Sequence, residues 1–113
     1  MIYVGTAGWS YKDWEGVFYP SNLSKDMQLS YYAEKFNTIE INSSFYRIPE
    51  EKMAYLWLKK VEKNSSFMFT LKAYGGWTHE DTFKEEEGEK MKNVLRIMKE
   101  ENRLGIMLFQ FPY

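Results

Sequence analysis

Apolar positions along the chain follow two different periods. Four short, β-prone apolar runs predict strands, and they lie at residues 2–5, 38–46, 67–74 and 104–113. Between these runs, apolar residues recur every three or four positions, which predicts three amphipathic helices. Successive strand starts are 36, 29 and 37 residues apart, the size of a strand-helix-strand unit. Three right-handed crossovers would then build a four-stranded parallel α/β sheet, in a single domain covering residues 1–113.

Each predicted helix presents one apolar stripe. The stripes are Leu29, Tyr32, Ala33 and Phe36 in the first helix, Met53, Leu56, Trp57 and Val61 in the second, and Met91, Val94, Leu95 and Met98 in the third. Ser24 is the predicted N-cap of the first helix and Pro49 opens the second, while the third is expected to end near Asn102.

Alternation within the strands predicts which side chains share a face of the sheet. We expect the helix-covered face to carry Ile39, Ile41, Phe67, Phe69, Leu71, Met107, Phe109 and Phe111. The opposite face is expected to carry Glu40, Asn42, Met68, Thr70, Lys72, Ile106, Leu108 and Gln110. This second set becomes polar toward the carboxyl ends of the strands, which is where α/β folds bind ligands.

Glu40 is the first candidate functional residue. A carboxylate on the inner face of a sheet is costly unless it is paired, so we expect it to bond to Lys72, Arg47 or a ligand. In a functional role, Glu40 would be a general base or a metal ligand. In the structural alternative, it forms an ion pair with no chemical role.

His79 is the only histidine and lies in the loop after the third predicted strand. Near a carboxylate, its imidazole could shuttle protons or bind a metal ion; the alternative is an exposed or capping side chain. One imidazole with carboxylates such as Glu40 and Asp81 makes a poor zinc ligand set, so we predict no metal site. The sequence leaves any cofactor open.

Four further polar side chains are expected near the same strand ends. Lys72 and Arg47 would suit a phosphate or carboxylate group on a substrate, or they would simply neutralise Glu40. Asn42 and Gln110 can both donate and accept hydrogen bonds, so they would fix a ligand or a water, or satisfy each other.

The predicted loops after the strands are rich in aromatic residues. Flat rings around a polar pocket can stack on a sugar or a base, and Trp9 and Tyr46 are the best placed for this role. The alternative is that these rings pack the loops onto the rim of the sheet.

Charge and composition narrow the classes of partner. The 15 basic and 16 acidic residues give a formal net charge of −1, which argues against a nucleic-acid partner. The chain has no cysteine, so disulfides and thiolate metal sites are excluded. It also shows neither a signal peptide nor an apolar run of roughly 18 residues, so we expect a cytoplasmic protein with no membrane partner.

Four sequence blocks resemble, in order and spacing, the N-terminal motifs of the DUF72 (YecE-like) family. The blocks are GTAGWSYKDWEGVFYP, EINSSFYRIP, KAYGGWTH and LFQFPY. The resemblance implies a TIM-barrel-like fold but says little about activity. Family members are about twice as long as this chain, so the resemblance also implies that the chain is the N-terminal half of a barrel.

A half-barrel leaves its inner face uncovered and its edge strands unpaired. We therefore expect a homo-oligomer, a dimer that completes the barrel, or association with a second half-barrel chain. Three functional hypotheses follow. The first is a pocket that performs acid/base chemistry on a small polar or phosphorylated ligand, with catalytic Glu40, His79 and Lys72. The second is a non-catalytic half-barrel that serves as an assembly module. The third, nucleic-acid processing, rests on fold analogy alone.

Overall fold

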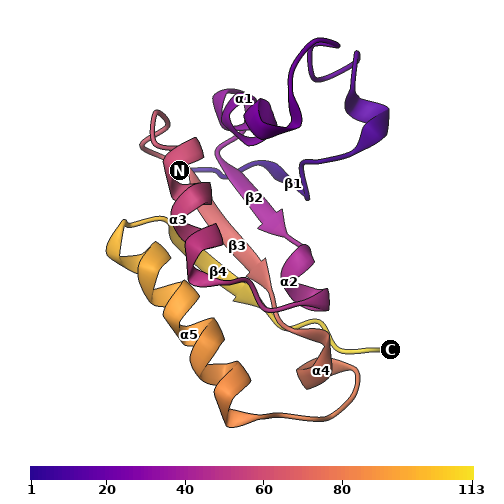
Figure 1. The fold of residues 1–113 in the computed structure, drawn as a ribbon, viewed down its shortest axis with the longest axis vertical. Coiled ribbons are helices and arrows are strands. Elements are labelled where there is room, and N and C mark those ends of the chain that lie inside the picture. The colour runs from indigo at the N-terminus through magenta and orange to yellow at the C-terminus, as the bar shows by residue number, and fades with distance from the viewer.

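Four strands form one parallel sheet in the computed structural model, which describes residues 1–113. In spatial order they are β1 (Gly5–Ala7), β2 (Thr38–Ile41), β3 (Met68–Lys72) and β4 (Leu104–Leu108). Spatial order equals chain order, and every neighbouring pair is parallel (Figure 1). The predicted α/β architecture with three crossovers is confirmed.

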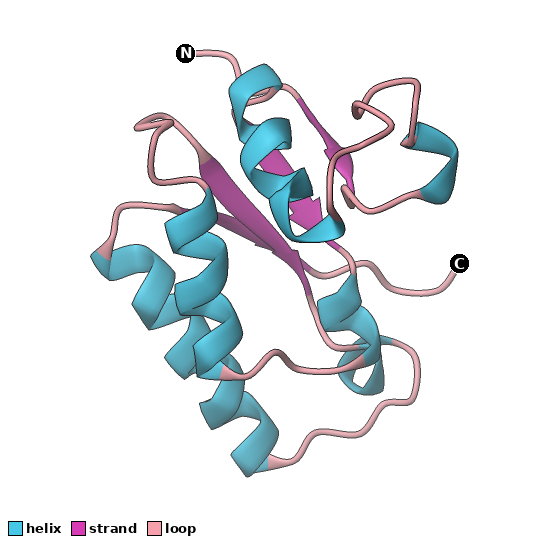
Figure 2. Ribbon diagram, turned by 45° about the horizontal axis from the view of Figure 1, so that its top comes forward, coloured by secondary structure: helices cyan, strands magenta, loops and turns pink.

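The three long helices lie on the same side of the sheet (Figure 2). They are α1 (Gln28–Lys35), α3 (Glu51–Lys60) and α5 (Glu85–Glu100). Two single-turn helices, α2 (Ser43–Tyr46) and α4 (Gly75–Thr78), follow β2 and β3, and two 3-10 turns, η1 (Lys12–Trp14) and η2 (Lys25–Met27), lie in the loop after β1. No helix of the chain has both the length and the apolar character needed to cross a membrane.

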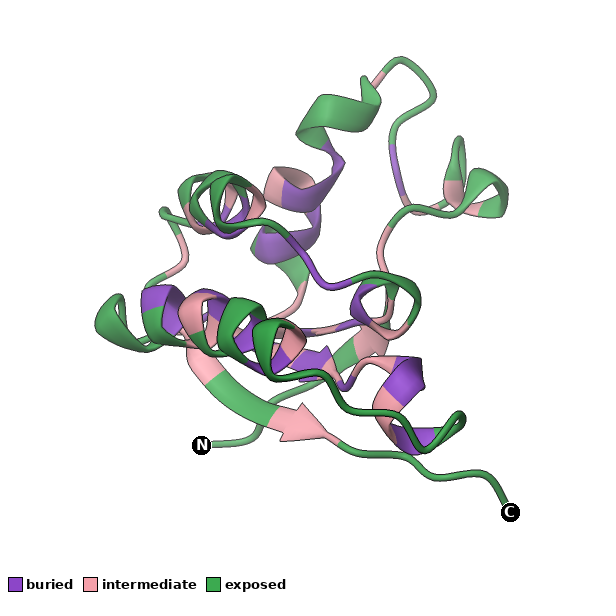
Figure 3. Cartoon of the chain, turned by 60° about the horizontal axis from the view of Figure 1, so that its bottom comes forward, coloured by how far each residue is buried: buried purple, intermediate pink, exposed green.

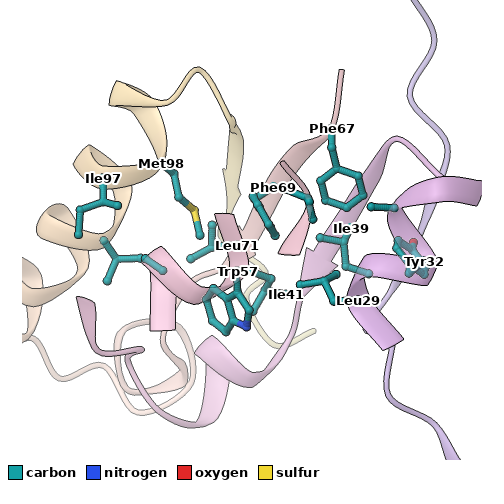
Figure 4. Packing of buried hydrophobic residues seen from close by; sticks show 14 of the residues in the cluster. Leu29, Tyr32, Ile39, Ile41, Trp57, Phe67, Phe69, Leu71, Ile97 and Met98 are labelled. Carbon is teal, nitrogen blue, oxygen red and sulfur yellow. The ribbon is translucent and has the colours of Figure 1, made fainter. Parts of the chain in front are cut away.

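The core lies between the sheet and these helices. The strand side chains that face the helices are fully buried: Ile39, Ile41, Phe67, Phe69 and Leu71. They meet side chains such as Leu29, Tyr32, Trp57 and Met98 from the helices (Figure 4). The alternation predicted for β2 and β3 is therefore confirmed, and it is the alternation that drives their polar residues to the other face.

Two details of the predicted helices are wrong. Leu56 was expected in the apolar stripe of α3, but 43% of it is exposed and Ala54 is buried instead. Met53, Trp57 and Val61 of the predicted stripe do pack on the core, and Ala54 joins them on that face of the helix in place of Leu56. Ser24 precedes the 3-10 turn η2 and makes no side-chain capping bond, while the first α-helix begins four residues later.

The predicted second strand is too long. β2 ends at Ile41, and the residues that follow Asn42 form α2 instead of continuing the strand to Tyr46. Ser44 explains the change of direction. Its hydroxyl donates to the carbonyl of Ile41 at 3.0 Å and contacts the carbonyl of Lys72 at 2.5 Å, so the buried turn joins the ends of β2 and β3.

The first strand begins later than predicted, at Gly5 rather than Ile2. The side-chain amide of Asn37 replaces a neighbouring strand for the preceding residues: it donates to the carbonyl of Ile2 at 2.9 Å and accepts from the backbone N–H of Val4 at 2.8 Å. Residues 2–4 are consequently exposed, as Figure 3 shows near the N-terminus.

β4 contains a bulge that the alternation rule did not foresee. Phe69 pairs with Leu104 but Leu71 pairs with Met107, so two residues of β4 oppose one residue of β3. Met107 packs against the core as predicted. However, β4 ends at Leu108, and Phe109 and Phe111 are 52% and 63% exposed, so their predicted burial under the helices is wrong.

The face of the sheet opposite the helices is open. Glu40, Thr70 and Lys72 are only partly buried on this face, and Ile106 is largely exposed. Figure 3 shows β4 and the chain after it as exposed or intermediate along their length. We call this surface the inner face, because the resemblance described above implies that it faces the interior of a barrel.

Burial in this one-sided core makes a simple stability prediction. Replacing Ile39 with Val removes one buried methylene and should lower the free energy of unfolding by about 0.5 to 1.5 kcal/mol. Urea denaturation followed by circular dichroism measures this loss. The matched substitution Ile2→Val, at an exposed position, should change it by less than about 0.5 kcal/mol. Equal effects of both substitutions would contradict the described core.

Candidate functional site

The end of β3 and the segments that follow β2 and β3 bring Lys72 and His79 to one aromatic ring, that of Phe45. The Lys72 ammonium lies over the face of the Phe45 ring, 4.9 Å from its centroid. The His79 imidazole meets the same ring edge to face, at 5.0 Å and with an interplanar angle of 88°. The ring of Phe45 therefore holds together two of the three side chains predicted to be catalytic.

Backbone geometry fixes the position of Phe45. The α2 turn that carries it is held by the Ser44 hydroxyl, as described above. On its other side the ring packs against Gly75, where an added Cβ would lie 2.8 Å from the Phe45 Cζ. Only a residue without a side chain fits there, so the first glycine of the Gly75-Gly76 pair seats the ring.

His79 is exposed but oriented. Its Nδ1 lies 2.8 Å from the hydroxyl of Thr78, and its backbone N–H donates to the carbonyl of Gly75 at 2.8 Å. The predicted loop position is correct, because His79 directly follows α4. The contact through Nδ1 leaves Nε2 as the ring nitrogen that can meet a ligand.

Glu40 lies on the inner face, between Ala7 of β1 and Thr70 of β3. The four ion pairs of the chain are Arg47–Glu50, Lys52–Glu50, Lys60–Asp26 and Lys92–Glu89. The predicted pairing of Glu40 with Lys72 or Arg47 is therefore wrong. The inner face is open, so solvent reaches the Glu40 carboxylate and a protein partner is not needed.

Arg47 lies outside the cluster. The chain turns at α2, so Arg47 follows that turn and its guanidinium reaches Glu50, at 3.8 Å, instead of the inner face. Lys72 has no carboxylate within ion-pair distance. The alternative in which Lys72 and Arg47 simply neutralise Glu40 is therefore wrong.

The two predicted amide residues do not meet. Asn42 occupies the position before α2 and makes no side-chain capping bond, and Gln110 is exposed beyond the end of β4. Gln110 lies past the strand because β4 ends early, so the expected mutual hydrogen bond is absent. A role for either amide in binding a ligand stays a prediction.

Trp9 and Tyr46 differ in exposure. Trp9 is half-buried, packs edge to face against Trp57 at 6.2 Å, and its carbonyl accepts a hydrogen bond from the Tyr19 hydroxyl. Burial, and to a lesser degree the neighbouring Tyr32, raises the pKa of the Tyr19 hydroxyl, which keeps it a neutral donor.

Tyr46 is 78% exposed, and its ring centroid lies 5.0 Å from that of Phe45. Trp9 thus helps pack the loop after β1, and ligand stacking by either ring stays a prediction.

Sequence reasoning missed the three residues that organise the cluster: Phe45, Ser44 and Gly75. A phenylalanine after a strand resembles any rim residue, and a serine there was interpreted as part of the strand. The adjacent glycines were the one available signal, since such pairs mark turns and close approaches. No group of three or more His, Asp or Glu side chains is positioned to hold a metal ion.

Comparisons with known proteins agree with this architecture. The model of the family described as "Protein of unknown function DUF72" matches residues 3–113. The UPF0759 protein YunF of Bacillus subtilis (strain 168) is 33% identical to this chain over an alignment 118 residues long. The alignment covers 99% of this chain and 40% of YunF.

Solved structures give the same result. A DUF72 family protein from Thermotoga maritima MSB8 superposes with a TM-score of 0.76 at 34% identity, over 99% of this chain and 45% of that one. A second DUF72 family protein, from Enterococcus faecalis V583, superposes with a TM-score of 0.75 at 23% identity, over 99% of this chain and 40% of that one. At this identity the likeness concerns the fold alone. The predicted TIM-barrel-like half-barrel is confirmed, and the chain spans less than half the length of these relatives.

The contact between the Phe45 ring and Gly75 can be tested with Gly75→Ala. The added methyl must displace the ring, so we expect a loss of about 1 to 3 kcal/mol in the free energy of unfolding and a shift of the His79 ring proton resonances. Because His79 is the only histidine, its resonances need no further assignment. In the matched variant Gly88→Ala the methyl meets Phe83 instead, and the His79 resonances should stay in place. An unshifted His79 in Gly75→Ala would contradict the cluster.

Proposed function

The chain belongs to the DUF72 family, and from this premise we propose that its strand ends form part of a barrel pocket for a small anionic ligand. The ligand carries a phosphate or carboxylate group, which Lys72 and His79 bind. The observation that carries the proposal is the convergence of these two side chains on Phe45 without a counter-charge.

The lack of a partner for Lys72 supports this assignment. An ammonium group over a ring has no counter-charge and keeps N–H donors directed away from the ring for an anion, whereas a lysine in an ion pair is already neutralised. The Phe45 ring also removes part of the side chain's freedom, which lowers the entropy lost on binding. A phosphate or carboxylate therefore replaces the missing counter-charge.

His79 and Glu40 would supply acid/base chemistry at the same pocket. The imidazole presents Nε2 as the nitrogen that would donate or accept a proton, while Nδ1 is occupied by the Thr78 hydroxyl. Glu40 lies on the inner face below the strand ends, where its carboxylate would act as a base or orient the polar end of the ligand. This catalytic assignment extends the binding proposal and depends on it.

Inorganic phosphate tests the binding proposal directly. Titration at constant ionic strength should shift the single His79 ring signal saturably, and chloride should not. Lys72→Met removes the ammonium, so the affinity should fall by about tenfold. The matched variant Lys35→Met removes another lysine stacked on a ring, Tyr31, and should bind phosphate as the natural chain does. Equal affinity in Lys72→Met, or no saturable shift, would refute the site.

A half-barrel also needs cover for its inner face. We propose that a second copy of this chain supplies it, β4 of each copy pairing with β1 of the other to close an eight-stranded parallel barrel; a separate half-barrel chain is the alternative. The exposed apolar side chains Ile106, Phe109 and Phe111 support association at this side of the molecule. If the assembled face binds no ligand, the chain is a non-catalytic assembly module. The near-neutral charge still argues against nucleic acid.

Light scattering across a concentration series tests the assembly. The expected mass is twice the 13.6 kDa of one chain, and Ile106→Lys should shift the protein to the monomer because it places a charge on the inner face. Leu56→Lys makes the same kind of change on the outer surface of α3 and should leave the mass unchanged. A natural chain that is monomeric at every concentration would overturn the dimer.

A further inference from the structure

We propose that the outer surface carries a second binding site, for an aromatic carboxylate, between α3 and the segment that joins it to α2. The site, which we call the α2–α3 pocket, is a cavity of about 350 Å³. It is lined by Ser43, Arg47, Ile48, Pro49, Glu50, Lys52, Met53 and Trp57. It contains none of the residues assigned above to the phosphate or carboxylate pocket.

The floor of the α2–α3 pocket is apolar and rigid. Trp57 is only 5% exposed, and Ile48 and Pro49 beside it are buried. The Trp57 indole is held from two directions, edge to face by Trp9 at 6.2 Å and at a tilt by Phe69 at 6.5 Å. The floor is therefore formed before a ligand arrives, which spares the ligand the entropy of ordering it.

The indole nitrogen of Trp57 is a free donor in this otherwise buried side chain. It makes no hydrogen bond to the protein. Two side-chain polar atoms are both buried from solvent and without a hydrogen-bond partner, Gln28 Oε1 and Trp77 Nε1. The Trp57 nitrogen is not among them, so solvent reaches it. Figure 4 shows it turned away from the labelled strand side chains Phe69 and Leu71. An indole N–H that the protein leaves unpaired and that solvent reaches can donate to a ligand, so an acceptor atom of a ligand fits this position.

The rim of the pocket favours a negative ligand. Arg47 and Lys52 both reach the carboxylate of Glu50, at 3.8 and 3.7 Å, so two cations share one anion. Both side chains are largely exposed, and exposed ion pairs of this length hold weakly. One positive charge is left over, and the guanidinium of Arg47 can bind a carboxylate through two parallel hydrogen bonds.

Size and lining together select the ligand class. A cavity of this volume lies at the lower end of the range for small-molecule sites, which are mostly apolar with a few polar groups at fixed positions. A flat ring matches the floor of Trp57 and Met53, and a single carboxylate matches the rim. Inorganic phosphate has no apolar part to fill the floor, so phosphate distinguishes the strand-end pocket from the α2–α3 pocket.

The probe for this site is 2-naphthoate. We expect the indole N–H signal of Trp57, one of four in the ¹⁵N spectrum and identified by its loss in Trp57→Phe, to shift saturably with a dissociation constant on the order of 1 mM. Arg47→Gln should weaken binding about tenfold. Lys59→Gln, at the other end of α3 and outside the pocket, should not change it.

Three results would overturn the proposal. The first is a shift of other tryptophan signals without that of Trp57, which places the probe elsewhere. The second is equal binding of 2-naphthoate by Arg47→Gln and Lys59→Gln, which removes Arg47 from recognition. The third is equal binding of uncharged 2-naphthalenemethanol, which removes the carboxylate from recognition. Unchanged dispersion of the remaining amide signals confirms that each variant is folded. The phosphate titration follows His79 rather than Trp57, so failure at one site does not mimic failure at the other.

Discussion

One-sided burial of the parallel sheet is the constraint on which the rest of the structure depends. In β2 and β3 every second side chain is buried against α1, α3 and α5, and the strands cannot slip by one residue without exposing that whole set. The side chains in between must therefore point to the opposite face of the sheet. Glu40, Thr70 and Lys72 reach the inner face because their neighbours are held on the other side.

The same constraint explains what could be predicted from the sequence. The alternation of Ile39 and Ile41 around Glu40 was enough to assign faces, and the spacing of apolar runs gave the parallel topology. Details that depend on contacts between distant segments were missed. The end of β2 is set by Ser44 reaching the carbonyl of Lys72, 28 residues away. The faces in β4 change at a bulge, and Gly105, a glycine inside a strand, was the one local signal for it.

Prediction of the site was limited for a related reason. Charged residues at strand ends are visible in the sequence, so Lys72, His79 and Glu40 were recognised as candidates. Their partners were not, because an expected ion pair rests on charge alone whereas the observed cluster rests on the shape of a phenylalanine ring and a glycine. Arg47 shows the same limit: its charge suggested the inner face, but the turn at α2 directs it to the outer surface beside Glu50.

The bulge in β4 has a consequence for how the edge of this sheet meets other extended segments. A regular parallel edge offers evenly spaced N–H and C=O groups to any extended peptide, which is how cross-β aggregates grow. An inserted residue breaks the spacing of the ladder and increases the local twist. The edge of β4 is therefore a poorer template for a straight strand than a regular edge would be, and a single irregular residue works against amyloid-like growth.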